Sequence, residues 1–143
     1  MRVESLKKTL RVESWGHRLG APMFNFEKLE VWQKAIGFAD LVYTLTRSFP
    51  SEERFGLTNQ MRRAAVSVSS NVAEGSSRIS RSDFARFIEL ATGSVFEVVS
   101  QATIGLRQGF LSRADHARIY SAAEEQSRML SGLRKSLRVE SAK

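Results

Sequence analysis

The chain has 143 residues, of which 42% are hydrophobic and 26% are charged, as is typical of one globular domain. It contains no cysteine, which excludes a disulfide scaffold, cysteine-ligated metal sites and a thiol nucleophile. No apolar run approaches the roughly 18 residues that cross a membrane, and charges occupy the N-terminal positions where a signal peptide would be apolar. We therefore expect a cytoplasmic protein without a membrane partner.

The formal net charge of +7 is concentrated at the two ends of the chain. Residues 1–22 contain five basic and two acidic residues, and residues 127–143 contain five basic residues and one acidic residue. The intervening residues 23–126 have no net charge. Basic ends favour a polyanionic partner such as RNA, because lysine and arginine neutralise phosphates and release counterions. Basic ends also serve solubility, and cations are favourable near a helix C-terminus.

Residues 1–22 differ in character from the remainder of the chain. They contain a near-repeat, in which RVESLKKTL is followed by RVESWGHRL. Gly16, Gly20 and Pro22 then interrupt any helix, and two copies are too few for a solenoid. We expect residues 1–22 to be a flexible basic tail or translated upstream sequence, and residues 23–143 to form a folded domain.

Four amphipathic segments predict helices over about 25–48, 52–74, 82–109 and 113–137, because apolar residues recur at spacings of three and four. Serines three residues ahead of Asp83 and Asp115 predict N-caps for the third and fourth helices. Near-equal helices with short links pack best as antiparallel neighbours, so the predicted fold is an all-α, up-down four-helix bundle. The four apolar stripes are Leu29, Trp32, Ile36, Ala39 and Tyr43; Leu57, Met61, Ala65, Val68 and Val72; Phe84, Ile88, Ala91, Val95, Val98, Ala102 and Leu106; and Ile119, Ala123, Gln126, Leu130, Leu133 and Leu137.

A second face of the 52–74 helix is polar. Such a stripe is either a solvated face or a second packing surface, on which small residues let another helix approach. Glu89, Gly93 and Glu97 of the next helix could face it. We interpret the pattern as an interhelix or intersubunit polar network rather than a catalytic site, because no nucleophile is paired with a base. The stripe consists of Gln60, Arg63, Ser67, Asn71 and Glu74, and it continues to Arg78.

The link GSSRISRS (75–82) combines hydroxyl groups with Arg78 and Arg81 at a helix N-terminus, which is a favourable place for an anion. Its serines also serve as caps, and its glycine fits neither a P-loop nor a dinucleotide fingerprint. We therefore expect contact with phosphate but no nucleotide hydrolysis. His17 and His116 are isolated, and no helix carries a Glu-x-x-His pair, so we expect no metal site and no cofactor.

Several segments resemble a known family in order and register. They are FEKLEVWQKA (26–35), FPSEE (49–53), LTNQMRRAAVSVSSNVAEGSSR (57–78) and DFARFIELATGSVFEV (83–98). The chain is similar over 24–137 to the bacterial four-helix-bundle proteins encoded in intervening sequences of 23S ribosomal RNA genes. A relative of that family is the accessory variability protein of diversity-generating retroelements.

The resemblance implies a homopentamer of four-helix protomers with a basic surface that contacts RNA, or a reverse transcriptase in the retroelement relative. The resemblance implies neither a catalytic role nor a small-molecule substrate. The positions that match the family's polar motif are Gln60, Arg62, Arg63, Asn71, Glu74, Gly75, Glu89, Ser94 and Glu97.

The function predicted from the sequence is that of a non-enzymatic, oligomeric protein associated with RNA or a ribonucleoprotein. It would bind the phosphate backbone without strong sequence preference, because no residue pattern here reads base edges. The alternatives are a protein–protein assembly module and a reverse-transcriptase accessory protein that does not itself bind RNA. An RNA-processing enzyme is disfavoured, because no acid–base constellation is present. The predicted phosphate-binding residues are Arg62, Arg63, Arg78, Arg81, Arg134 and Lys135.

Overall fold

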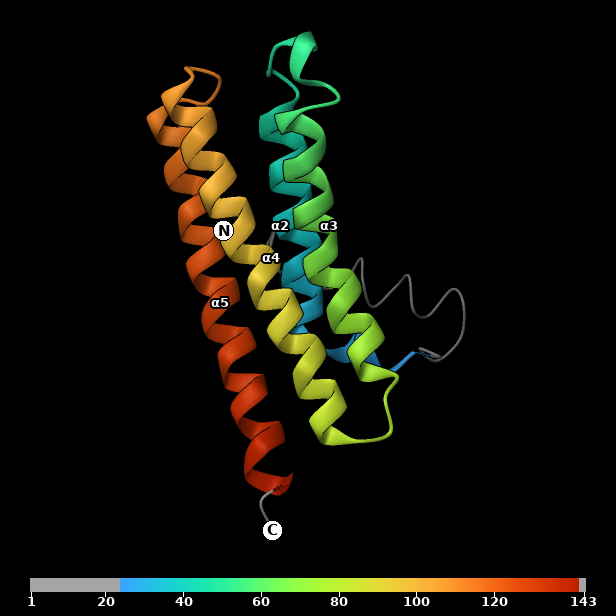
Figure 1. The fold of residues 1–143 in the computed structure, drawn as a ribbon. Helices are drawn as coiled ribbons and strands as arrows, with labels where there is room; N and C mark the ends of the chain where they lie inside the picture. Colours follow the sequence, from blue (N-terminus) through green and yellow to red (C-terminus); the bar gives the residue numbers. More distant parts are fainter. Residues whose placement is uncertain (1–23, 142–143) are drawn as a thin grey trace, which may run out of the picture.

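The computed structural model describes residues 24–141, with their side chains through residue 138. The expected flexible tail, residues 1–22, lies outside the described residues. Four long helices lie side by side, with short connections at both ends (Figure 1). The elements in chain order are η1 (Asn25–Lys28), α2 (Glu30–Thr46), η2 (Ser51–Glu53), α3 (Leu57–Ser76), α4 (Arg81–Arg107) and α5 (Arg113–Ser141).

Each helix packs on two neighbours, in an arrangement that encloses one core. Helix α3 contacts α2 and α4, and α5 contacts α4 and α2. Consecutive helices run in opposite directions, so the α3–α4 turn lies at the same end of the bundle as the last residues of α5 (Figure 1). The predicted all-α, up-down four-helix bundle is confirmed for the described part of the chain.

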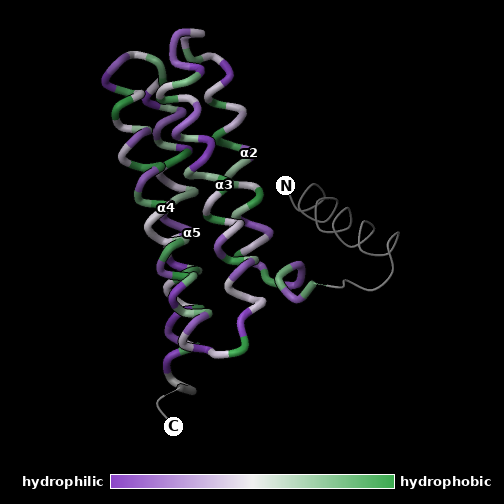
Figure 2. The backbone as a smooth tube through the Cα atoms, turned by 45° about the vertical axis from the view of Figure 1, so that its right-hand side comes forward, coloured by the Kyte–Doolittle hydropathy of each residue, from purple (hydrophilic) through white to green (hydrophobic). Residues whose placement is uncertain are grey.

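The apolar stripes predicted for α3, α4 and α5 form the walls of this core. Met61, Ile88, Ile119 and Leu130 are fully buried. Hydrophobic and hydrophilic residues alternate along each helix in Figure 2, as expected where one face is buried and another is exposed. The core therefore lies on the faces that the periodicity predicted for these three helices.

The stripe predicted for the first helix is wrong. The buried face of α2 consists of Val31, Ala35, Phe38, Val42 and Leu45. Of the predicted stripe, Leu29, Trp32 and Ala39 pack only at the margin of the core, while Ile36 and Tyr43 are exposed. Both rows satisfy the spacing of three and four, so periodicity alone could not decide between them.

The first two helices also begin later than predicted. Residues 25–28 form a separate 3₁₀ turn, and Leu29 is extended (φ −78°, ψ 121°), so α2 begins at Glu30. Residues 51–53 form another 3₁₀ turn, after which α3 begins at Leu57. The Glu53 carboxylate accepts a hydrogen bond of 3.0 Å from Leu57 N. Glu53 therefore satisfies a backbone donor at the start of α3 from outside the helix.

The last two helices begin where the capping pattern predicted. Ser80 Oγ accepts a hydrogen bond from Asp83 N at 3.0 Å, and Ser112 Oγ accepts one from Asp115 N at 3.1 Å. Between these helices, Gly109 has a φ of 79°, a conformation that favours glycine. Helix α5 continues to Ser141, past the predicted end at residue 137.

Candidate functional site

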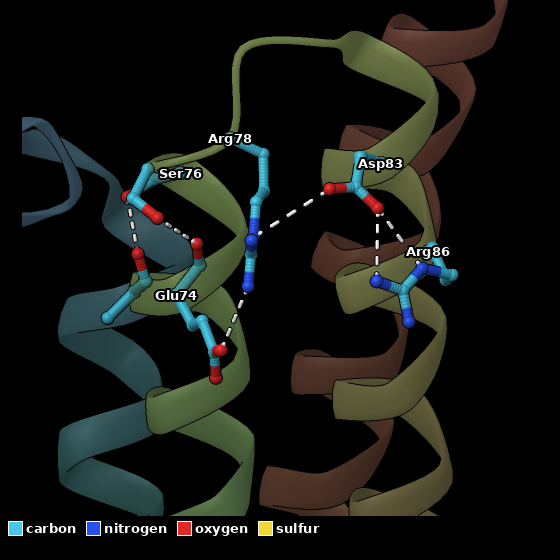
Figure 3. Close-up of polar contacts among 7 residues, drawn as sticks. Glu74, Ser76, Arg78, Asp83 and Arg86 are labelled. Atoms are coloured by element: carbon cyan, nitrogen blue, oxygen red, sulfur yellow. Dashed lines mark hydrogen bonds and ion pairs between the residues drawn. The ribbon is translucent and has the colours of Figure 1, made fainter.

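The turn between α3 and α4 holds two of the predicted phosphate-binding residues. Gly75 lies in the last turn of α3, where a β-carbon would approach Phe87 Cβ to 2.7 Å and Phe84 Cδ1 to 2.9 Å. Because only hydrogen fits there, α3 and α4 come close together just before the turn. Arg78 therefore reaches α4 side chains as well as those of α3 (Figure 3).

Carboxylates already contact the Arg78 guanidinium. Its Nη2 lies 3.0 Å from Glu74 Oε1, and its Nε lies 3.7 Å from Asp83 Oδ2 (Figure 3). Arg86 Nη2 is 3.0 Å from the other oxygen of Asp83. The two guanidinium groups also lie over the buried Phe87 ring, at 4.6 and 4.7 Å from its centre. Arg78 thus joins α3 to α4, and two acids partly compensate its charge.

Arg62 joins α2 to α3 in a similar way. Its Nε donates to Thr46 Oγ1 at 3.0 Å and its Nη2 to the Tyr43 carbonyl at 3.4 Å. The guanidinium lies 4.7 Å from the centre of the Tyr43 ring. Arg63, the next residue, is exposed and has no hydrogen bond or ion pair with any residue that the structure describes. Of these adjacent arginines, Arg63 is the one whose donors are available to a ligand.

The structure brings two of the residues predicted for the polar network together, at the contact between α3 and α4. Asn71 Nδ2 donates to Ser67 Oγ at 2.9 Å, and Ser94 Oγ donates to the same oxygen at 3.0 Å. Ser67 thus links the predicted residues Asn71 and Ser94. Ser67 lies on the predicted polar stripe, four residues before Asn71, but the pattern along one helix does not show that it also meets Ser94.

The four other predicted network residues do not join this cluster. Gln60 and Glu97 line an open groove of about 310 Å³ together with Ser67 and Ser94, but neither has a hydrogen-bond or ion-pair partner among residues 24–138. Glu74 pairs with Arg78 along its own helix. Glu89 faces α5 rather than α3. The reason is helical geometry, because positions eight residues apart, such as 89 and 97, differ by about 80° around the helix axis.

Glu89 pairs with the basic end of α5. Its Oε1 lies 2.8 Å from Arg134 Nη2 and 3.7 Å from Arg138 Nη2. Lys135 is exposed and has no ion pair with the described residues. The positive charge at the C-terminal end of α5 is therefore partly compensated by α4.

One contact joins a hydroxyl group to an imidazole, the pairing that a catalytic nucleophile would need. Thr103 Oγ1 lies 3.2 Å from His116 Nε2. Thr103 also donates its hydroxyl proton to the Val99 carbonyl at 3.0 Å. The Thr103 hydroxyl thus has two neighbours, the Val99 carbonyl and the imidazole, and which atom donates between Thr103 and His116 depends on the tautomer of His116. Within residues 24–141, no group of histidine and acidic side chains is arranged to hold a metal ion.

Comparison with known proteins identifies the family. The sequence profile described as 23S rRNA-intervening sequence protein matches residues 27–132. The chain belongs to this family.

The chain also shares its fold with a solved structure. A protein of unknown function from the S23 ribosomal protein family of Bacteroides thetaiotaomicron VPI-5482 is similar to it with a TM-score of 0.66 and 21% sequence identity. The match covers 73% of this chain and 98% of that chain. No curated protein sequence matches the chain significantly. None of the described helices is long and apolar enough to span a membrane.

Proposed function

We propose that this family member is a non-enzymatic, self-associating protein of the cytoplasm that binds the phosphate backbone of RNA with little sequence preference. Membership of a family described by its 23S rRNA intervening sequences is the observation that carries the proposal. The basic residues 1–22 and 127–143 support it, because clustered lysines and arginines attract a polyanion.

The six predicted phosphate-binding residues would contribute unequally. Arg63 and Lys135 are exposed, and neither has an ion-pair partner among the described residues. Arg81 is exposed in the first turn of α4. Arg62, Arg78 and Arg134 already bind protein groups and would contact RNA only through their remaining donors.

The experiment is a titration of a fluorescein-labelled 20-nucleotide RNA, followed by anisotropy at 50 and 200 mM NaCl. We expect the affinity to fall at least tenfold at the higher salt concentration, because each neutralised phosphate releases counterions. Three RNA sequences of equal length should bind within about threefold of one another, since contacts to phosphate carry no base information. Absence of binding at 50 mM NaCl would refute the proposal.

The second candidate function is an assembly module that does not bind RNA. Two observations favour it. Acidic residues compensate the charges of Arg78 and Arg134. In addition, α4 exposes three large apolar side chains, Leu90, Phe96 and Ile104. Large exposed apolar side chains are typical of a protein interface. Self-association without RNA binding at 50 mM NaCl would favour this candidate, with another copy of the chain as the partner.

A further inference from the structure

The turn between α4 and α5 brings together two arginines that are far from the residues predicted to bind RNA. Arg107 is the last residue of α4 and Arg113 is the first residue of α5. Both line an open pocket of about 500 Å³, together with Leu106 and His116. The α4–α5 turn lies at the opposite end of the bundle from the α3–α4 turn (Figure 1).

The core holds this turn in a fixed shape. The backbone N–H groups of Phe110 and Leu111 both donate to the Gly105 carbonyl, at 2.9 and 3.2 Å. Leu111 is buried, and the Phe110 ring packs 5.7 Å from the ring of Phe49 in the α2–α3 connection. The backbone positions of Arg107 and Arg113 are therefore defined before any ligand binds, which lowers the entropic cost of binding.

The charge of this pocket is not compensated. No acidic residue lines it, and neither arginine has a hydrogen bond or ion pair with any residue that the structure describes. Asp115, two residues after Arg113, pairs with Arg118 at 3.3 Å. The arginines of the α3–α4 turn and of the end of α5 differ in this respect, because carboxylates occupy Arg78 and Arg134.

Two uncompensated guanidinium groups on one pocket match the chemistry of phosphate. Each presents a planar fork of N–H donors that can bind two oxygens of a phosphate group. The pocket is also larger than one phosphate requires, so the adjoining sugar of a nucleic acid strand has room. His116 forms another wall and is held through Nε2 by Thr103.

We propose that this pocket binds a phosphodiester of RNA and is the main backbone contact of the described protomer. This inference rests on the proposed RNA-binding function and assigns it a site. An RNA at the α3–α4 turn would have to compete with Glu74 and Asp83 for Arg78, whereas no acid competes at the α4–α5 turn.

The test compares two double variants of the full chain that carry equal charge changes. Arg107→Gln with Arg113→Gln removes both guanidinium groups from the pocket. Lys28→Gln with Arg47→Gln removes two exposed cations that lie outside the pocket and outside both basic ends of the chain, and that have no ion-pair partner among the described residues. A third variant, Arg107→Lys with Arg113→Lys, keeps the charge but loses the planar forks.

The probe is the same labelled RNA at 50 and 200 mM NaCl. We expect the pocket variant to lose at least tenfold in affinity at 50 mM NaCl and the control variant less than threefold. The slope of affinity against salt should decrease by about one to two in the pocket variant, because two phosphate contacts are lost. The lysine variant should keep the salt slope and bind with intermediate affinity. Circular dichroism and light scattering check that all variants fold and assemble alike.

The outcomes distinguish a failure of the pocket assignment from a failure of the proposed RNA-binding function. Equal losses in the pocket and control variants would show that affinity follows net charge, which overturns the pocket while RNA binding stands. No loss in the pocket variant would also overturn it. Absence of binding by the wild type would overturn both proposals. Calorimetric titration with inorganic phosphate tests whether the pocket is instead a site for free phosphate. Phosphate binding without RNA binding would overturn the assignment of the pocket to RNA.

Discussion

The side-chain amide of Gln126 donates a hydrogen bond of 3.1 Å to the backbone carbonyl of Val31. Gln126 is only 2% exposed and lies in the apolar stripe of α5, between Ala123 and Leu130. The bond joins α5 to the first turn of α2, two neighbouring helices with fewer contacts than the other adjacent pairs. Because a buried polar group must find its partner, this residue favours one register of α5 against α2.

We predict that Gln126→Glu lowers the free energy of unfolding by about 3 kcal/mol at pH 8, because it places a buried carboxylate against a carbonyl oxygen. Burial raises the pKa of the new carboxyl group above its value of about 4.3 in the unfolded chain. The native state then binds the proton more tightly, so the penalty grows as the pH rises from about 4 toward the native pKa and shrinks as the pH falls.

Urea unfolding at pH 4.5 and pH 8, at one protein concentration, measures this effect. Wild type supplies the background from other groups, and Gln60→Glu is the matched control, because Gln60 is exposed. The control should change stability by less than about 0.5 kcal/mol at either pH. Equal stability of wild type and Gln126→Glu at pH 8 would show that the amide is not held as described.

The local features of the fold could be predicted from the sequence, and the rotation of each helix only in part. The Ser80 and Ser112 caps act within one turn, so residues three apart predict them. The stripes of α3, α4 and α5 were identified because each of these helices has one dominant apolar row. Helix α2 has two such rows, and only packing against α3 and α5 selects the row that contains Phe38.

We predict that Gly75→Ala destabilises the protein by about 1–3 kcal/mol, although alanine is the better helix former. The added β-carbon would lie 2.7 Å from Phe87 Cβ, so α3 and α4 would have to separate. Gly37→Ala should have the opposite effect, a gain of about 0.5–1 kcal/mol, because Gly37 lies in α2 with nothing within 4 Å of its added carbon. Chemical denaturation of both variants measures whether the two changes in the free energy of unfolding have opposite signs. Stabilisation by Gly75→Ala would contradict the close approach of α3 to α4 at this residue.

The contacts of the candidate site were less predictable than the caps, for a physical reason. Arg62 bonds to Thr46, and Glu89 pairs with Arg134 on another helix. Such pairs depend on how two helices rotate about their axes, which spacing along one helix does not determine. The polar stripe of α3 was visible in the sequence, but its division into a Ser67 cluster and a separate Arg78 cluster required the three-dimensional structure.

We predict that Ser80→Ala lowers the free energy of unfolding by about 1 kcal/mol, or the melting temperature by about 4 °C. The Ser80 hydroxyl accepts the Asp83 N–H at 3.0 Å, and alanine leaves that donor at the start of α4 without its cap. Ser82→Ala is the control, because Ser82 is exposed in the same turn and does not cap the helix. If Ser80→Ala and the control melt at the same temperature, the Ser80 cap does not contribute to stability.

The last prediction concerns self-association through the outer face of α4. Phe96 is 63% exposed and lines a largely apolar groove of about 520 Å³ between α4 and α5, which also contains Tyr120. Leu90 and Ile104 are exposed on the same helix. Large apolar side chains that are exposed to water favour association, because covering them with a second copy would remove them from water.

We therefore predict that light scattering of the wild type gives a mass near five times 16.1 kDa and that Phe96→Glu shifts it toward 16.1 kDa. A charge in the contact would lose its hydration when the copies associate, which opposes assembly. Because Phe96 is exposed in the protomer, the variant should keep its helical circular dichroism. Phe55→Glu is the matched control, since Phe55 is 82% exposed on the α2–α3 connection, away from this groove. A monomeric wild type at micromolar concentration, or equal dissociation by both variants, would rule out the α4 face as the contact between copies.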